Sequence, residues 1–186
     1  LPRALVTRRL VYAWIDPVNH WLVIDAASPA KAELVLDHLK LALDDLPLKL
    51  LRTRVAPGTA MSAWLAGHEA PAGFSIDRDC ELRAPGEDKA VVRYVRHPLD
   101  GAEVARHVAD GKAVTRLALT WRDRISFVLT EQLQVKRVAF LDVLKEDAER
   151  QADGGDDAFE ANFALMSGEL PQLLADLVAA LDGEAE

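Results

Sequence analysis

Lysine and arginine side chains recur on stretches of the sequence that are predicted to be β-strands. Residues two positions apart on a strand point to the same face, so Arg52 lies beside Arg54 and Arg122 beside Arg124. Cations gathered on one face of a sheet are suited to binding phosphate groups without reading a base sequence. The predicted sheet-borne cations are Arg52, Arg54, Arg93, Arg96, Lys112, Arg116, Arg122, Arg124, Lys136 and Arg137.

Stacking aromatic residues are not interleaved with these cations. A binding surface for single-stranded nucleic acid needs exposed aromatic rings for the bases, so the pattern favours contact with a duplex backbone. An alternative interpretation stays open, in which the cations are solvated charges that protect the edges of the sheet from aggregation.

Three carboxylates offer a different chemistry. Asp16 and Asp25 lie at the ends of adjacent predicted strands, and Asp123 lies in a predicted turn. Converging carboxylates can hold Mg²⁺ for phosphodiester cleavage, which makes a metal-dependent nuclease an alternative function. Asp16 also precedes Pro17, where aspartate is a common turn residue.

Other signatures of catalysis are absent from the sequence. It contains no Gly-rich dinucleotide motif, phosphate-binding loop, nucleophile elbow or zinc-protease motif, and its five histidines show no short ligand spacing. The single cysteine, Cys80, has no neighbouring base and excludes a disulfide scaffold, as expected in a reducing cytosol. We therefore predict a protein that is not an enzyme and has no cofactor or bound metal.

Charge is unevenly distributed along the chain. The 186 residues carry 22 basic and 30 acidic side chains, a net charge of −8. Residues 91–140 hold 9 basic and 5 acidic groups (+4), whereas residues 141–186 hold 2 and 13 (−11). The acidic segment leaves a further alternative open, a protein-interaction module that acts through its C-terminal helices. Because no apolar run approaches the roughly 20 residues of a membrane span, we predict no membrane association.

The pattern of elements predicts an α+β fold with antiparallel sheet. We expect a hairpin (8–16 and 20–25), a helix from Ser28 to about Asp45, a strand from Leu48 to Arg54 and a helix over 57–66. Extended pieces at 74–76, 80–83 and 90–97 precede a helix over 99–110, a β-meander (112–121, 124–130, 133–140) and helices over 141–151, 156–166 and 170–183. The predicted segments are 1–56, a hairpin, helix and strand; 57–140, a helix with a basic antiparallel sheet; and 141–186, an acidic helical segment.

Collinear stretches of the sequence resemble the RdgC family of bacterial recombination-associated proteins. They are residues 1–4, 14–16 with 18–19, 27–28 with 31–33, 111–112, 114–119, 121, 124–125, 127–128, and the long run Phe159–Leu170. The resemblance implies that roughly the first third of a longer protein precedes this chain. Its matching cations are Arg96, Lys112, Arg116, Arg124, Lys136 and Arg137, which we predict to contact DNA.

The same resemblance implies the protein's partners and location. The family is similar in forming a ring-shaped homodimer with a basic hole, in binding mainly duplex DNA with little sequence preference, and in restraining RecA in homologous recombination, replication and repair. Single-stranded DNA remains a further partner. A cytoplasmic, nucleoid-associated protein is expected. An exonuclease description also attaches to the family, and the sequence contains no motif that supports it.

Overall fold

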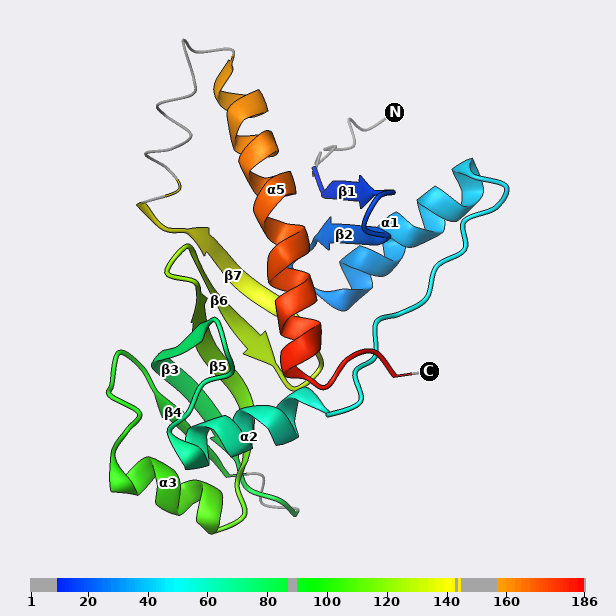
Figure 1. The fold of residues 1–186 in the computed structure, drawn as a ribbon. Coiled ribbons are helices and arrows are strands. Elements are labelled where there is room, and N and C mark those ends of the chain that lie inside the picture. The colour runs from blue at the N-terminus through cyan, green and yellow to red at the C-terminus, as the bar shows by residue number, and fades with distance from the viewer. Residues whose placement is uncertain (1–9, 87–89, 143, 145–156, 186) are drawn as a thin grey trace, which may run out of the picture. The chain divides into compact units, whose positions relative to one another are not determined.

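The computed structural model describes residues 10–86, 90–142, 144 and 157–185. The chain divides into two compact units, residues 1–50 and residues 51–186, which are described separately as the N-terminal and the C-terminal unit. Both helices and antiparallel sheets are present, so the predicted α+β class is confirmed (Figure 1).

The N-terminal unit contains the predicted hairpin and the helix that follows it. Strands β1 (Tyr12–Asp16) and β2 (Trp21–Asp25) pair antiparallel, with Asp16 opposite Trp21. Asp16 closes the turn, because its Oδ1 accepts the backbone N–H groups of Val18 and Asn19, each at 3.0 Å. Helix α1 (Pro29–Ala42) begins with proline in its first turn, where the missing N–H costs no hydrogen bond.

Apolar side chains of the N-terminal unit are exposed to an unusual degree. No residue of α1 is buried, and Leu34 and Leu41 are 60% and 87% exposed. The large exposed apolar residues of this unit are Leu10, Val11, Tyr12, Ile15, Val18, Leu34, Leu41, Leu43, Leu48 and Leu50. Every residue of the main hydrophobic core comes instead from the C-terminal unit.

The C-terminal unit contains a five-stranded antiparallel sheet in the order β4-β3-β5-β6-β7. The strands are β3 (Phe74–Arg83), β4 (Val91–Tyr94), β5 (Ala113–Trp121), β6 (Ile125–Thr130) and β7 (Val135–Phe140). The predicted meander is confirmed in β5, β6 and β7. The two extended pieces predicted at 74–76 and 80–83 are one strand, since β3 pairs with β5 through two register irregularities.

The strand predicted over Leu48–Arg54 is wrong. Residues 48–52 have no strand assignment, and only Thr53 forms an isolated bridge, to Glu184. A strand needs a neighbouring strand to pair with, and among the described residues this segment has only the bridge at Thr53.

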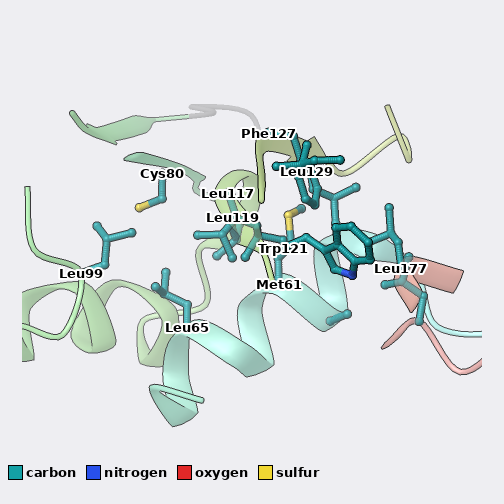
Figure 2. Packing of buried hydrophobic residues seen from close by; sticks show 14 of the residues in the cluster. Met61, Leu65, Cys80, Leu99, Leu117, Leu119, Trp121, Phe127, Leu129 and Leu177 are labelled. Carbon is teal, nitrogen blue, oxygen red and sulfur yellow. The ribbon is translucent and has the colours of Figure 1, made fainter. Parts of the chain in front are cut away.

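Helices pack on one face of the sheet and contribute side chains to the hydrophobic core. Helix α2 (Pro57–Gly67) packs on β5, and helix α3 (Ala102–Ala109) packs against α2. Figure 2 shows Trp121 of β5 between side chains of α2 and of the C-terminal helix. The fully buried large side chains include Met61, Leu65, Leu82, Leu117, Leu119, Trp121, Ile125, Leu129, Leu173 and Leu181.

One continuous helix, α5 (Asp157–Ala180), replaces the two helices predicted over 156–166 and 170–183. The helix contains Gly168 and Pro171, although proline donates no hydrogen bond to the preceding turn. The helix continues through both residues, and its leucines Leu173 and Leu177 reach the core on one stripe. The helix predicted over 141–151 lies almost entirely outside the described residues.

Within the described residues, one stretch of α5, Asn162–Ala180, is long and apolar enough by length and composition to cross a membrane. The expectation that no apolar run approaches this length is therefore wrong. Such a stretch is weak evidence for a span, because core helices of other proteins have the same composition. Its two acidic residues, Glu169 and Asp176, pair with arginines of the sheet, so we assign it to the folded unit.

Candidate nucleic-acid interface

Alternate residues of β5 separate the two faces of the sheet. Leu117, Leu119 and Trp121 point into the core, so Arg116, Ala118 and Thr120 point to the opposite face. Residues paired directly on neighbouring strands share a face, so the register of the strands assigns the residues of the other strands to one face or the other. The residues on the face opposite the core, here the outer face, include Arg83, Glu81, Arg93, Arg116, Thr130 and Lys136.

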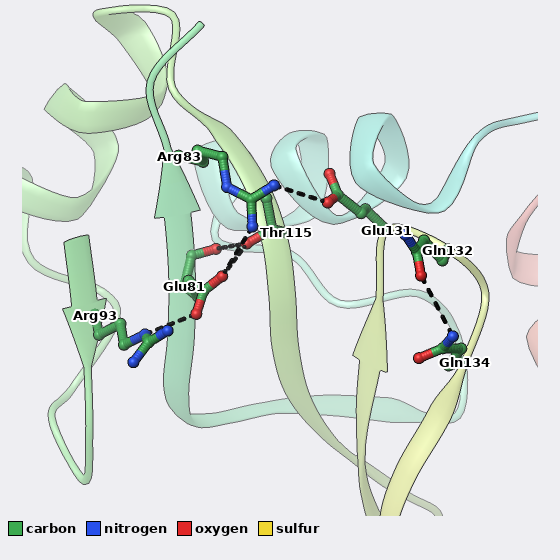
Figure 3. Close-up of polar contacts among 7 residues, drawn as sticks. All are labelled: Glu81, Arg83, Arg93, Thr115, Glu131, Gln132 and Gln134. Carbon is green, nitrogen blue, oxygen red and sulfur yellow. Dashed lines mark hydrogen bonds and ion pairs between the residues drawn. The ribbon is translucent and has the colours of Figure 1, made fainter. Parts of the chain in front are cut away.

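A buried carboxylate lies at the centre of the arginines on the outer face (Figure 3). The Glu81 side chain is only 5% exposed, yet its oxygens accept hydrogen bonds from Arg93 Nε at 2.7 Å and Thr115 Oγ1 at 2.8 Å. Arg83 Nη2 lies 3.5 Å from the same carboxylate. Arg116 is directly opposite Glu81 in the register of β3 and β5.

These neighbours keep Glu81 ionised despite its burial. Burial alone would raise the pKa of the carboxyl group, but the hydrogen bonds from Thr115 and Arg93 and the charge of Arg116 outweigh it. The pKa of Glu81 is therefore lowered from its ordinary value of 4.5.

Three of the predicted cations lie on or beside the outer face. Arg116 is exposed on β5, and Lys136 lies on β7 opposite Val128 of β6. Arg137 occupies an irregularity in β7 with a φ of 53°, and its side chain is 78% exposed. Its Nη1 lies 3.9 Å from Asp79 Oδ2.

Arg96 is held close to the same aspartate. It follows β4 with a φ of 52°, and its backbone N–H donates to Asp79 Oδ1 at 2.7 Å. Asp79 therefore contacts the backbone of Arg96 and the side chain of Arg137, which are 41 positions apart in the sequence.

The remaining predicted cations have partners elsewhere. Lys112 Nζ lies 3.0 Å from His107 Nδ1, beside the end of α3. Arg124 makes two contacts with the carboxylate of Glu169 on α5, at 3.0 and 2.6 Å. The structure thus places Lys112 beside α3 and Arg124 beside α5. Their role as DNA contacts stays a prediction.

The tight turn between β5 and β6 explains where Arg124 lies. Arg122 and Asp123 have φ values of 47° and 53°, as in the two-residue turns that match the twist of a hairpin. Arg122 stacks over the Trp121 ring at 4.6 Å and donates to Asp176 Oδ2 at 2.8 Å. The basic pair at this turn therefore fastens α5 to the sheet.

Acidic residues on β3 are the part of the interface that the sequence interpretation missed. Asp77, Asp79 and Glu81 occupy alternate positions, and Thr120 Oγ1 lies 3.0 Å from Asp77 Oδ2. Buried Cys80 indicates the opposite phase of the strand, so the alternation was present in the sequence. The outer face is therefore a mixture of fixed acids and cations.

Comparison with known proteins gives the family. The family model described as "Putative exonuclease, RdgC" matches residues 1–184. The chain belongs to the RdgC family. "Recombination-associated protein RdgC" of Dechloromonas aromatica is 59% identical over 187 residues, covering 99% of this chain and 62% of that protein. Proteins of the same name from Janthinobacterium sp. (strain Marseille) and Herminiimonas arsenicoxydans are 55% and 54% identical, covering 100% and 99% of this chain and 62% and 61% of their own length.

These comparisons confirm the resemblance to the RdgC family, and these relatives are named recombination-associated proteins. The chain spans about 62% of the length of the relatives. The activity and partners of a whole family member are therefore matters for proposal.

The family description names an exonuclease, and the candidate metal ligands for such an activity are Asp16, Asp25 and Asp123. Asp16 lies opposite Trp21 and Asp25 opposite Tyr12, so the two aspartates are at opposite ends of the hairpin. Four residues along a strand span about 13 Å, whereas Mg²⁺ binds oxygen at about 2.1 Å, so one ion cannot contact both. Asp123 lies in the C-terminal unit, in the β5–β6 turn.

Asp16 already has a structural role in its own turn. Hydrogen bonds from the side chain and the backbone of Asn19 are the main reason that the pKa of Asp16 is lowered from 3.8. Among the residues that the structure describes, no group of three His, Cys, Asp or Glu side chains is arranged to hold a metal ion. The geometry therefore does not support the metal site that the nuclease alternative requires.

Proposed function

We propose that this chain binds duplex DNA without sequence preference and modulates homologous recombination by occupying DNA that a RecA filament would use. The observation that carries the proposal is the set of outer-face cations contributed by β4, β5 and β7, in a chain whose relatives are named recombination-associated proteins. Arg116, Lys136 and Arg137 are the proposed phosphate contacts, with Arg96 beside them.

The shape of the sheet favours contact with the backbone over reading of bases. Neighbouring strands are about 4.8 Å apart, so five strands form a surface about 20 Å wide. The major groove of DNA is about 12 Å wide and admits a helix or a two-stranded ribbon. A surface of this width contacts phosphates across a groove and carries little sequence information.

The side chains between the cations favour a duplex over a single strand. Ala118, Thr120, Ser126 and Val128 occupy the outer face of β5 and β6. The aromatic residues of the sheet, such as Trp121 and Phe127, belong to the core cluster on the other face. Stacking of unpaired bases would need rings on the outer face.

We further propose that the protein acts as a ring-forming homodimer that encloses DNA. The exposed apolar residues of the N-terminal unit support this proposal, because large exposed side chains such as Leu34 and Leu41 are typical of a surface on which another polypeptide packs. A bound ring would exclude RecA sterically, would act without catalysis or a cofactor, and would locate the protein to the cytoplasmic nucleoid.

The alternative function, recognition of a protein partner by the acidic helices, requires acidic side chains that are not already paired within the chain. On α5, Glu169 and Asp176 are paired with Arg124 and Arg122 within the unit. This pairing favours a structural role for these two acids over recognition of a protein partner.

The proposal is tested by replacing both Lys136 and Arg137 with alanine. Each phosphate contact that is lost makes the log–log dependence of affinity on salt less steep by about 0.9, so the double variant is expected to reduce the slope by about 1.8. Fluorescence anisotropy with labelled duplexes of two unrelated sequences measures this slope. Both sequences should lose affinity equally.

Arg106→Ala is the matched control. Arg106 is an exposed cation on α3, a helix that reaches the core side of the sheet through Val104. Its removal should leave the slope unchanged. A slope unaffected by the double variant, or a loss confined to one sequence, contradicts the proposed contacts.

A further inference from the structure

Glu81 is an acid at the centre of a surface proposed to bind an anion. Simple electrostatics predicts that such an acid weakens DNA binding. Its side chain is nevertheless almost fully buried, and donors from β3, β4 and β5 converge on it: Arg83, Arg93 and Thr115. A buried carboxylate with several charge-assisted hydrogen bonds is a rigid anchor for the groups that donate to it.

The anchored arginines keep donors available. Arg93 donates to Glu81 through Nε, and its side chain is 66% exposed, so donors of its terminal Nη groups remain accessible to a second partner (Figure 3). Arg116 is exposed directly opposite Glu81, and no polar contact of its guanidinium is found among the described residues. A guanidinium held by one edge presents its other donors in the planar fork that matches two phosphate oxygens.

We propose that Arg93 and Arg116 form a phosphodiester-binding site on the outer face and that Glu81 is its positioning residue. The inference rests on the proposed DNA-binding function and adds Arg93 and Glu81 to it. Without the anchor, long arginine side chains must be ordered when DNA binds, which weakens each contact. Thr115 Oγ1 donates a hydrogen bond to the carboxylate of Glu81, and Arg83 is a further cation beside the same carboxylate.

The substitution Glu81→Gln separates positioning from charge by the sign of its effect. It removes one negative charge from the outer face, so an account based on charge alone expects tighter binding. The positioning account expects duplex affinity to fall by about threefold to tenfold, since the arginines lose their charged anchor. Glu131→Gln is the matched control, because Glu131 is a more exposed acid whose carboxylate contacts Arg83 and whose link to Thr115 is made by its backbone N–H, which the substitution leaves in place.

The experiment measures duplex anisotropy across a salt series for the wild type, both glutamine variants and an Arg93→Ala/Arg116→Ala variant. We expect Glu131→Gln to bind as tightly as the wild type or more tightly. Glu81→Gln should weaken binding and flatten the salt slope, and it should cause no further loss when added to the double alanine variant.

Two results overturn the inference. The first is that Glu81→Gln binds the duplex as tightly as Glu131→Gln does. The second is that Glu81→Gln weakens binding further in the double alanine background, where only a structural role would act. Thermal unfolding is recorded for each variant, and Thr115→Val replaces Glu81→Gln as the test if the latter unfolds. If Lys136→Ala/Arg137→Ala weakens binding while Glu81→Gln does not, the proposed function stands and this inference fails. A wild-type chain that does not bind the duplex contradicts both.

Discussion

Replacing Asp176 with alanine should destabilise the C-terminal unit by about 1–3 kcal/mol. Asp176 Oδ2 accepts a hydrogen bond from the indole Nε1 of Trp121 at 2.8 Å and one from Arg122 at 2.8 Å. Trp121 is fully buried, so alanine leaves its indole N–H without an acceptor in the core.

The magnitude follows from the two contacts. An unsatisfied buried donor costs about 1–3 kcal/mol. The ion pair is partly exposed, with side chains 47% and 32% accessible, so it contributes only about 0.2–1 kcal/mol. The better helix propensity of alanine offsets about 0.5 kcal/mol of the loss. In a protein of this size the net change lowers Tm by about 2–12 °C.

Circular dichroism during heating and a guanidinium titration measure the change. Asp176→Asn is the control, because its side-chain oxygen still accepts the indole hydrogen bond while the charge is removed. The asparagine variant should lose less than about 1 kcal/mol. Equal destabilisation by both variants, or no loss in the alanine variant, would refute the role assigned to the Trp121–Asp176 hydrogen bond.

Two further predictions concern pH and packing. Burial raises the pKa of Asp77 above 3.8, with the charge of Asp79 adding to the effect and the hydrogen bond from Thr120 opposing it. The folded state therefore favours the protonated carboxyl group, and ionisation of Asp77 lowers the stability of the protein at pH values above its folded pKa. Asp77→Asn should raise Tm at pH 7 and leave Tm unchanged near pH 3. An equal change in Tm at both pH values would contradict burial of the charge as the cause. Leu177→Ala removes a buried core side chain of α5 and should cost about 2–5 kcal/mol in chemical denaturation, more than the same change at the less buried Leu174.

Local patterns predicted most of the secondary structure. Alternation in 112–140 and the turn at Pro17 gave the meander and the hairpin, because short-range register depends on neighbouring residues. The wrong predictions concern segments whose secondary structure depends on contacts with residues far away in the sequence. Residues 48–54 had the composition of a strand without a partner strand, and α5 continues through Pro171 while its leucines pack on the sheet.

The candidate site was predictable only in part, for the same reason. Two-residue spacing groups cations on a strand, but the face they occupy depends on which neighbours are buried. Lys136 lies on the outer face, whereas Arg124 contacts Glu169, 45 positions away, and no local pattern reveals that contact. Glu81 was missed because no local pattern reveals that its carboxylate is buried and accepts hydrogen bonds from Arg93 and Thr115.

The most direct test of the central claim is anisotropy of a labelled duplex titrated with this chain over a salt series in the presence of Mg²⁺. The DNA is then examined on a denaturing gel. We predict saturable binding that weakens steeply with salt, equal for unrelated sequences, with the DNA intact. Absence of binding at low salt would contradict the assignment of a phosphate-contacting surface to these residues, and Mg²⁺-dependent shortening of the strands would contradict a non-catalytic role.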